Sequence, residues 1–346
     1  KCRGEGRREI DTMDTFVDSS WYFLRYLSPK DTDKPFDPSI VNRWLPVDQY
    51  IGGVEHAILH LLYSRFIVKV LCDLGTVGFD EPFERLFTQG MIIKDGVKMS
   101  KSKGNVVSPD ELIARYGADT VRLYTLFIGP PEKDAEWSDR GVEGAFRFLN
   151  RLWRLLKLLS SRGVLTQKAA PTEVLGEEAL AVRRKLHATL KKVTEDIERS
   201  FSFNTAIAST MELVNEIYRY LGQDEKPLSE SEKVLLRETF EKLVVMLAPF
   251  VPHLSEEMWS CLGHRESIFR SRWPRYDPSA LEVAEVMVVV QVNGKVRSRV
   301  RVPSAISEEG LKEKILKDPS VQKWLVGKPV KQWIIVPQKL VNLVAG

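Results

Sequence analysis

Apolar and polar residues in the N-terminal third of the chain follow the order strand, helix, strand. Val47 to Ile51 is a short apolar-rich run that ends in Gly52-Gly53, which predicts a strand followed by a tight turn. Glu55 to Leu74 has the length and composition of a helix, and Leu86 to Ile93 those of a second strand. This order predicts a βαβ unit with a parallel sheet.

The middle of the chain has the period of helices. Ser108, Pro109 and Glu111 predict a capped helix start, and Ala118 to Ile128 predicts the next helix. From Gly144 onward the helices lengthen, the first with an apolar stripe of Phe148, Leu152, Leu155 and Leu159 and a basic stripe of Arg147, Arg151 and Arg154. Three more are expected over Glu177–Arg199, Asn204–Tyr220 and Ser229–Met246, the last with Ser229 and Glu232 at capping-box spacing. These helices predict a bundle.

The C-terminal segment returns to a period of two. Val286 to Val302 alternates around Asn293-Gly294, which predicts a β-hairpin, and Ile334–Val336 and Leu340–Val344 predict further strands. We therefore expect an α/β region over residues 1–142, a helical bundle over 143–275 and a small α+β domain over 283–346. A chain of 346 residues is long for one core, which agrees with two or three domains.

Composition and charge narrow the function classes. With 43% hydrophobic and 28% charged residues the chain is an ordinary globular protein, and it has neither an apolar signal core nor a membrane span. Three cysteines far apart fit neither a zinc site nor a disulfide framework, and indicate a reducing, cytoplasmic location. Residues 283–346 hold 11 Lys and Arg against 5 Asp and Glu, more than the whole net charge of +4. This basic segment predicts either a nucleic-acid partner or a solvated surface.

A lysine-rich loop carries the strongest chemical indication. Lys98-Met99-Ser100-Lys101-Ser102 is followed by Lys103-Gly104-Asn105, so three lysines lie within six residues among small hydroxyl residues and a glycine. Ammonium groups on a mobile loop can neutralise phosphate oxygens, with hydroxyl and backbone donors adding to the effect. A generic loop of this composition would be a solvated surface feature.

Two further segments combine glycines, histidines and aromatic residues. Gly52-Gly53 precede Glu55, and His56 and His60 are four residues apart, which would place both rings on one helix face. A zinc protease needs its glutamate inside the histidine pair, and here Glu55 precedes it, so we expect no metal site; core hydrogen bonds are the other interpretation. The second segment, Asp14 to Tyr22, would by itself be a core segment with a helix cap.

Together these segments resemble the leucyl-tRNA synthetases, which are class I aminoacyl-tRNA synthetases, of the bacterial type. The five residues from Lys98 match the KMSKS motif of class I enzymes, and the segments at 14–22 and 52–60 are similar to those around the leucine and adenylate sites. The resemblance implies ATP binding by Gly52, Gly53, Glu55, Gly90, Met91, Lys98, Met99, Ser100, Lys101 and Ser102. It implies leucine contacts by Phe16, Ser19, Tyr22, His56 and His60, and charge stabilisation by Lys98 and Lys101.

The resemblance extends over the remaining chain. Ser202 to Ala206 and Leu247 to His253 are similar to the anticodon-binding helical domain, and Val290 to Arg297 to the C-terminal domain of bacterial-type enzymes. It implies tRNA(Leu) binding by basic residues, for which Arg147, Arg151, Arg154, Lys295, Arg297 and Arg299 are the candidates. The implied fold is the C-terminal half of a class I Rossmann domain, then the bundle and the small domain. The implied reaction activates leucine with ATP, accompanied by Mg²⁺, and transfers it to tRNA(Leu).

Two parts of the family pattern are missing from this sequence. The His-x-Gly-His phosphate motif and the inserted editing domain are absent, so we expect a C-terminal portion, or the C-terminal subunit of a split enzyme, that needs the N-terminal half for activity. Two alternatives stay open. One is a tRNA-binding module without chemistry, and the other is a valyl-, isoleucyl- or methionyl-tRNA synthetase portion. Measuring leucine-dependent activation distinguishes an enzyme from a tRNA-binding module without chemistry. Testing a panel of amino acids distinguishes a leucyl enzyme from a valyl, isoleucyl or methionyl enzyme.

Overall fold

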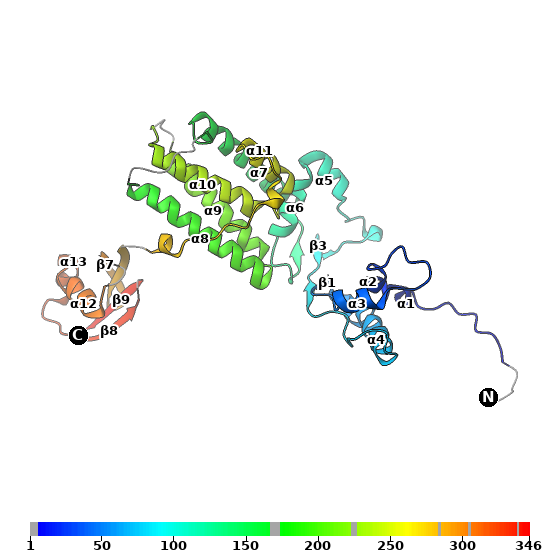
Figure 1. Ribbon diagram of the computed structural model, residues 1–346. Coiled ribbons are helices and arrows are strands. Elements are labelled where there is room, and N and C mark those ends of the chain that lie inside the picture. Colours follow the sequence, from blue (N-terminus) through cyan, green and yellow to red (C-terminus); the bar gives the residue numbers. More distant parts are fainter. Residues whose placement is uncertain (1–5, 167–173, 223–226, 283–284, 304–305, 338) are drawn as a thin grey trace. The chain divides into compact units, whose positions relative to one another are not determined.

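The computed structural model describes residues 6–166, 174–222, 227–282, 285–303, 306–337 and 339–346, without the side chains of Lys101, Glu285 and Val286 (Figure 1). The chain divides into two compact units. The first contains Lys1–Val182 and Thr189–Pro274, and the second contains Arg183–Ala188 and Arg275–Gly346. No helix of the described ranges is long and apolar enough to cross a membrane.

The first unit begins with an α/β portion built around the expected βαβ unit. Two strands pair in parallel and are joined by a 3₁₀ helix and a long α-helix; these elements are β1 (Tyr50–Gly53), η1 (Val54–Ile58), α4 (His60–Asp73) and β2 (Leu86–Gln89). Three short helices precede them, α1 (Thr15–Ser19), α2 (Tyr22–Arg25) and α3 (Pro38–Trp44). A small core of Phe23, Leu24, Phe36, Val41, Val68 and Val77 holds this portion together.

Three expectations for the segment from Val47 to Leu74 were wrong. The strand begins at Tyr50 instead of Val47, and Gly52 and Gly53 lie within it instead of forming a turn after it. Val47 forms only an isolated bridge with Phe83. The helix expected from Glu55 is a 3₁₀ helix up to Ile58 and becomes α-helical at His60, so the two histidines lie on different helices.

The strand expected over Leu86–Ile93 is divided into two strands that belong to different sheets. β2 ends at Gln89, and β3 (Ile92–Lys94) pairs with β4 (Val97–Lys98) and with β5 (Ala135–Glu136). The break falls at Gly90, where a Cβ would overlap the backbone carbonyl of Lys133. Asp95 and Gly96, both with positive φ, form the tight turn between β3 and β4. The lysine loop follows β4, with η2 at Lys101–Lys103.

A helical bundle completes the first unit. Helices α5 (Pro109–Tyr116) and α6 (Ala118–Phe127) lead into α7 (Asp139–Ser161), α8 (Glu177–Ser200), α9 (Phe203–Leu221), α10 (Glu230–Leu247) and α11 (Pro252–Cys261) (Figure 1). The capping box of Ser229 and Glu232 is confirmed. The one expected at Ser108 is wrong, because the Ser108 side chain makes no capping hydrogen bond. The apolar stripe of α7 is buried as expected. The helix α11 was not expected.

Hydrogen bonds join α6 to the start of α11. The buried carboxylate of Asp119 accepts from the backbone N–H of Leu254 at 2.7 Å, and its other oxygen lies 2.8 Å from His253 Nδ1. A negative group at a helix N-terminus satisfies free backbone donors and interacts favourably with the helix dipole. Arg122 donates to the Pro249 carbonyl at 3.1 Å in the same region. These bonds fix α6 to the start of α11.

The second unit is the expected small α+β domain. Its sheet has the order β7-β6-β9-β8, and two helices pack on one face; the elements are β6 (Glu285–Val292), β7 (Lys295–Pro303), α12 (Glu308–Leu316), α13 (Pro319–Leu325), β8 (Val330–Val336) and β9 (Leu340–Ala345). The hairpin at Asn293-Gly294 is confirmed, with positive φ at both residues. The strands at β8 and β9 are confirmed as well, and β8 is longer than expected.

Candidate nucleotide and amino acid site

The two glycine-containing segments meet at the carboxyl edge of the parallel sheet. In the pairing of β1 with β2, Gly53 lies opposite Gln89, so Gly52 and Gly53 lie beside the strand that runs into Gly90. Ligands of α/β proteins bind beyond the carboxyl ends of parallel strands. Two segments that are far apart in the sequence are therefore brought to the edge where a nucleotide would bind.

The glycine pair leaves room for two neighbouring side chains. A Cβ on Gly53 would overlap the carboxylate of Glu55, and a Cβ on Gly52 would press on the ring of Tyr50. The exposed Glu55 carboxylate thus lies directly over the bare backbone at the strand end. A carboxylate so placed can accept hydrogen bonds from vicinal hydroxyls, as acidic residues do for the ribose in dinucleotide-binding folds.

The backbone at Gly90 and Met91 is held by the segment before β5. Gly90 N–H donates to the Pro131 carbonyl at 2.9 Å, and Met91 N–H donates to the carboxylate of Asp134 at 2.6 Å. The Met91 carbonyl accepts from Ala135 N–H at 2.9 Å. The bend between β2 and β3 is therefore fixed from the side of β5, and both backbone polar groups of Met91 are already used.

The lysine loop lies at the end of the β3–β4 hairpin. Lys98 is the last residue of β4 and is exposed, whereas Met99 and Ser100 are half-buried. The hydroxyls of Ser100 and Ser102 lie 3.2 Å apart. Lys101 begins the 3₁₀ turn, but its side chain, for which the sequence predicts a catalytic role, lies outside the described residues. An exposed ammonium on such a loop can reach a polyphosphate.

The predicted leucine-contacting rings form one aromatic cluster. Phe16 and His56 meet edge to face with ring centroids 6.3 Å apart, and Tyr22 lies 5.6 Å from His60. The two imidazoles are 6.4 Å apart at an angle of 82°. The two imidazoles therefore lie close together, but they reach each other from two helices, so the prediction that both rings share one helix face is wrong. Ser19 lies nearby in sequence, half-buried, and its hydroxyl donates to the Phe16 carbonyl at 3.2 Å.

His60 is the most buried member of the cluster. It is 5% exposed, and burial, together with the neighbouring His56, lowers its pKa below the usual 6.5. Its Nδ1 lies 3.3 Å from the Ser64 hydroxyl, so one ring nitrogen is satisfied. His60 Nε2 and His56 Nδ1 are buried without a hydrogen-bond partner among the described residues. Unpaired buried polar atoms are costly, which makes these two nitrogens the polar groups open to a ligand.

Sequence reasoning missed three rings of this cluster. Tyr50 lies 5.6 Å from His60 and 4.6 Å from Phe83, and Tyr63 lies 6.3 Å from Phe16. Burial raises the pKa of the Tyr22 and Tyr50 phenols, which keeps both neutral. Tyr50 directly precedes the glycine pair, and that adjacency was an available indication. No local pattern indicates Phe83, because its segment is brought to the cluster by the bridge between Val47 and Phe83.

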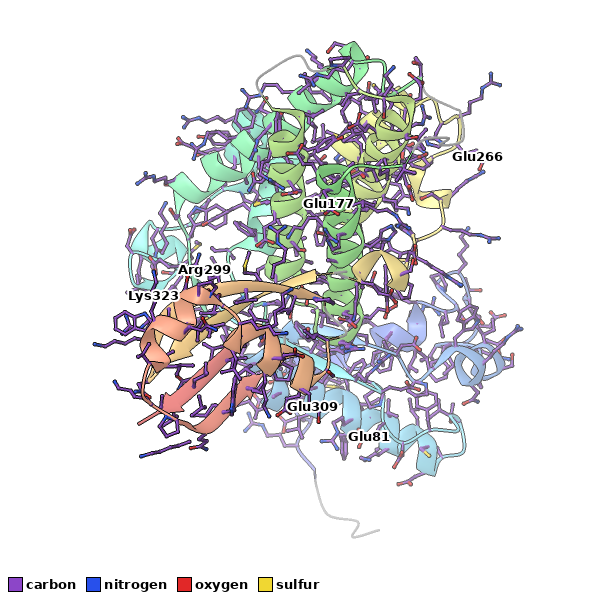
Figure 2. The ribbon with its side chains drawn as sticks, turned by 90° about the vertical axis from the view of Figure 1, so that its left-hand side faces the viewer. Glu81, Glu177, Glu266, Arg299, Glu309 and Lys323 are labelled. Carbon is purple, nitrogen blue, oxygen red and sulfur yellow. The ribbon has the colours of Figure 1, made fainter. Side chains whose placement is uncertain are left out.

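The predicted RNA-binding arginines fall into two groups. Arg147 and Arg154 are exposed on α7, and Lys295 and Arg299 are exposed on β7. Figure 2 labels Arg299. Arg151, by contrast, donates to the Asn215 side chain at 2.5 Å and covers the Tyr218 ring, which joins α7 to α9. Arg297 lies at 3.3 Å from the centroid of Trp324. The last two arginines therefore have packing roles within the fold.

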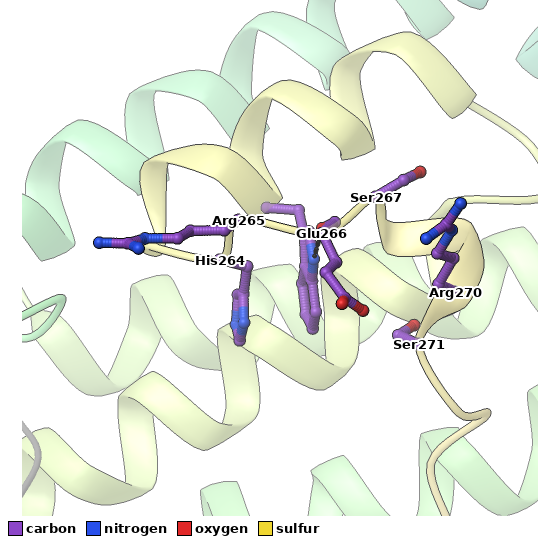
Figure 3. Close-up of a pocket in the computed structure, with 7 residues that line it drawn as sticks. His264, Arg265, Glu266, Ser267, Arg270 and Ser271 are labelled. Atoms are coloured by element: carbon purple, nitrogen blue, oxygen red, sulfur yellow. Dashed lines mark hydrogen bonds between the residues drawn. The ribbon is translucent and has the colours of Figure 1, made fainter.

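Two clefts of the described residues lie away from the lysine loop. One, of about 240 Å³, follows α11 and is lined by Trp259, His264, Arg265, Glu266, Ser267, Arg270 and Ser271. Figure 3 shows Arg265 and Arg270 at opposite ends of this cleft. Another of about 240 Å³ lies among α5, α6 and α7 beside Tyr116, Phe146 and Trp153. Within the described ranges no group of three His, Cys, Asp or Glu side chains is arranged to bind a metal ion.

Known proteins resemble this chain over its whole length. The family model of class I tRNA synthetases (I, L, M and V) matches residues 1–138, and that of the anticodon-binding domain of tRNA ligases matches residues 180–314. Leucine–tRNA ligases are 56% identical in Thermotoga petrophila, over 99% of the chain, and 53% identical in a Geobacter species, over 100% of it. The chain spans 41% of the length of each.

Solved structures give the same assignment. One is a leucyl-tRNA synthetase of Agrobacterium radiobacter in a ternary complex with tRNA and LeuAMS. The alignment covers 100% of the present chain and 43% of the length of that synthetase, with a TM-score of 0.81 and 40% identity. A Mycobacterium tuberculosis methionyl-tRNA synthetase aligns over 72% of the chain and 50% of its own, at a TM-score of 0.56 and 20% identity, and therefore shares the fold alone. Over 99% of its length the chain is thus similar to leucine–tRNA ligases, and its residues 1–138 match the family model of class I tRNA synthetases.

Proposed function

We propose that this chain supplies the lysine-loop part of a leucine–tRNA ligase and its tRNA-binding regions, and that it acts in the cytoplasm. The reaction joins leucine to ATP, which gives leucyl-adenylate and pyrophosphate, and then transfers leucine to tRNA(Leu). The observation that carries the proposal is the meeting of the two glycine segments at one sheet edge. In the chain, His56 and His60 follow the glycine pair at residues 52–53, and the lysine loop follows Gly90.

The chain's own groups would provide position and charge. Gly52 and Gly53 leave the backbone open to the adenosine, and the Glu55 carboxylate accepts from the ribose hydroxyls. The bend at Gly90 and Met91 supports the adenine. Lys98 and Lys101, with donors from Met99 N–H and from the Ser100 and Ser102 hydroxyls, stabilise charge that develops on the pyrophosphate when the leucine carboxylate attacks the α-phosphate. Magnesium enters with ATP and neutralises phosphate charge.

The aromatic cluster would hold the leucine side chain. Phe16, Tyr22 and Tyr50 give an apolar wall, and the lowered pKa keeps His60 neutral, so an isobutyl group meets no charge there. Specificity for leucine over a smaller side chain is then a matter of filled volume, which is worth about 1–3 kcal/mol per methylene. The unpaired ring nitrogens and the Ser19 hydroxyl provide polar contacts beside that wall.

The rest of the synthetase would complete the site. The chain spans 41% of its relatives, and it lacks the His-x-Gly-His motif that grips the phosphates from the other side. Large apolar side chains are exposed on and around β1, α4 and β2, namely Ile51, Ile58, Leu62, Phe66 and Leu86. Contiguous exposed apolar side chains mark a surface that packs against another segment. We therefore propose that the N-terminal part of a leucine–tRNA ligase covers this surface.

The bundle and the second unit would bind the tRNA. We propose functional parts at residues 1–142, 143–275 and 283–346, with tRNA(Leu) contacting the last two. The exposed Arg147, Arg154, Lys295 and Arg299 are suited to phosphate contacts, because their charges lie at the surface. For Arg151 and Arg297 we propose a supporting role instead, since both cover aromatic rings.

Lys101→Ala tests the catalytic proposal in the complete synthetase, with this chain joined to the N-terminal part of a leucine–tRNA ligase. Losing one such electrostatic contact is expected to slow leucine-dependent ATP–pyrophosphate exchange by about 10²–10³-fold. Lys30→Ala removes an exposed lysine outside the loop and should leave the rate unchanged. An unaltered exchange rate in Lys101→Ala would reject the role. Full tRNA binding by the wild-type synthetase with neither leucine-dependent exchange nor charging of tRNA would favour the non-catalytic alternative.

Arg154→Ala and Arg151→Ala test the division between the arginines. We expect Arg154→Ala to weaken tRNA binding and to lower the slope of log affinity against log salt by about 1, because one phosphate contact is lost. Arg151→Ala should lower the melting temperature, because it breaks the bond to Asn215, and should change the slope little. Equal slopes in Arg154→Ala and wild type, measured by filter binding with tRNA(Leu), would contradict the assignment.

A further inference from the structure

The lysine loop is anchored at a position where regular secondary structure has ended. Its strand, β4, contains only Val97 and Lys98, and its partner β3 ends at Lys94. A two-residue strand makes few ladder bonds, so the backbone from Met99 onward needs another partner to have a defined course. That course decides where the loop's ammonium groups lie.

The side chain of Asn105 is this partner. Its Oδ1 accepts from Ser100 N–H at 2.9 Å, and its Nδ2 donates to the Lys98 carbonyl at 3.4 Å and to the Lys94 carbonyl at 3.2 Å. One primary amide thus offers the donor and the acceptor that a neighbouring strand would offer to residues 98–100. The bond to Lys94 also fastens the loop to β3, which is paired with β5.

Gly104 makes this arrangement possible. It has a φ of +65°, in the left-handed region that favours glycine, and its Cα faces open space. The chain reverses there, after the 3₁₀ turn at Lys101–Lys103, so the next side chain returns to the hairpin. Asn105 is half-buried, as expected for an amide whose donor and acceptor are both used.

We propose that Asn105 is a positioning residue for leucine activation, holding Lys98 and the following loop in the geometry that meets the pyrophosphate. The proposal rests on the proposed function of the loop. An amide that binds three backbone groups of residues 94–100 orders the loop before ATP arrives. A displacement of about 1 Å in a catalytic group can lower a rate by about 10²-fold. The amide touches no reacting atom and acts through Lys98 and its neighbours.

The experiment uses the complete synthetase and three substitutions. Asn105→Ala removes all three hydrogen bonds. Asn105→Asp keeps the acceptor for Ser100 N–H but replaces the donor with an oxygen beside the Lys98 and Lys94 carbonyls. Asn42→Ala is the matched control, because the Asn42 amide also accepts from a backbone N–H, that of Gly78 at 2.6 Å, at a position outside the loop.

We expect Asn105→Ala and Asn105→Asp to lower kcat for leucine-dependent pyrophosphate exchange by about 10–100-fold, and to raise the KM for ATP. The KM for leucine should stay within about twofold of wild type, since the aromatic cluster is untouched. Asn42→Ala should lower the melting temperature and leave kcat unchanged.

Each other outcome rejects one of the two proposals. Wild-type kcat in both Asn105 variants would overturn the positioning role, and so would an equal loss of kcat in Asn42→Ala, because the effect would then be general destabilisation. Wild-type kcat in Asn105→Asp alone would also overturn it, since the donated bonds would not matter. If the wild-type synthetase showed no leucine-dependent exchange, the proposed function itself would fail.

Discussion

The helical bundle and the α/β portion of the first unit differ in how they bury their apolar residues. In the bundle Leu155 is 0% exposed and the stripe around it is covered by neighbouring helices. In the α/β portion α4 exposes Leu62 at 55% and Phe66 at 63%, and the adjoining β1 exposes Ile51 at 53%. The bundle therefore finishes its own core, whereas the α/β portion presents apolar surface that suits a further segment of polypeptide.

The two regions also differ in how they treat buried polar groups. In the bundle the buried hydroxyls of Thr210 and Thr239 donate to carbonyls one turn earlier. In the α/β portion two neighbouring buried nitrogens, His56 Nδ1 and His60 Nε2, have no partner among the described residues. In the bundle the Thr189 hydroxyl of α8 also lacks a partner among them. Such unsatisfied groups lower stability and are found at functional sites. The comparison agrees with the proposal that leucine and ATP bind in the α/β portion, whereas the bundle has the more completely closed core.

Leucine truncation in the two regions should give the largest contrast. Leu155→Ala is expected to lower the free energy of unfolding by about 2–5 kcal/mol, because it leaves a cavity in a closed core. Leu62→Ala in the same chain should cost less than about 0.5 kcal/mol, since its side chain is already exposed. Denaturant unfolding of both variants measures the difference. Equal losses of stability in the two variants would break the comparison. A loss for Leu62→Ala that is larger in the complete synthetase than in this chain alone would sharpen it.

Acid should weaken the α/β portion through His60. Its folded pKa is lowered, so as pH falls through about 6.5 the unfolded chain takes up a proton that the folded chain resists. Stability should therefore decrease from pH 7.5 to 5.5, by at most about 1.4 kcal/mol per pH unit, which is the limit for one proton. His60→Gln should flatten this dependence in a melting-temperature series. An identical pH profile in the variant would show that the ring tolerates its charge.

The smallest effect is expected at a surface ion pair of the α/β portion. Hydrogen bonds from Arg65 and then Lys69 lower the pKa of Glu81 to about 2. The stabilisation is present above the usual value near 4.5 and is lost as pH falls toward 2. All three side chains are over one-third exposed, so Glu81→Gln should cost less than about 1 kcal/mol at pH 7. The loss should shrink in 1 M salt, and a loss that salt does not change would contradict a screened ion pair.

Part of the candidate site could be read from adjacent residues. The lysine loop, the glycine pair and the histidines at 56 and 60 were identified because each lies within a short stretch of sequence. Tyr50 and Phe83 were missed as members of the aromatic cluster, and no local pattern indicates that Arg151 and Arg297 cover Tyr218 and Trp324. The neighbours of a side chain can come from a distant part of the sequence. Arg151 and Tyr218, for example, are 67 residues apart.

The sequence by itself determined the type of the longer elements. Alternation around Asn293-Gly294 specified a hairpin, and apolar residues at helical spacing specified the bundle, because backbone sterics and side-chain periodicity act within a few residues. Only the tertiary structure decided where elements break. The strand ends at Gly90 because the backbone of Lys133 approaches there, and the expected helix is first 3₁₀, from Val54 to Ile58. Such breaks follow from close packing between distant segments, which no local pattern records.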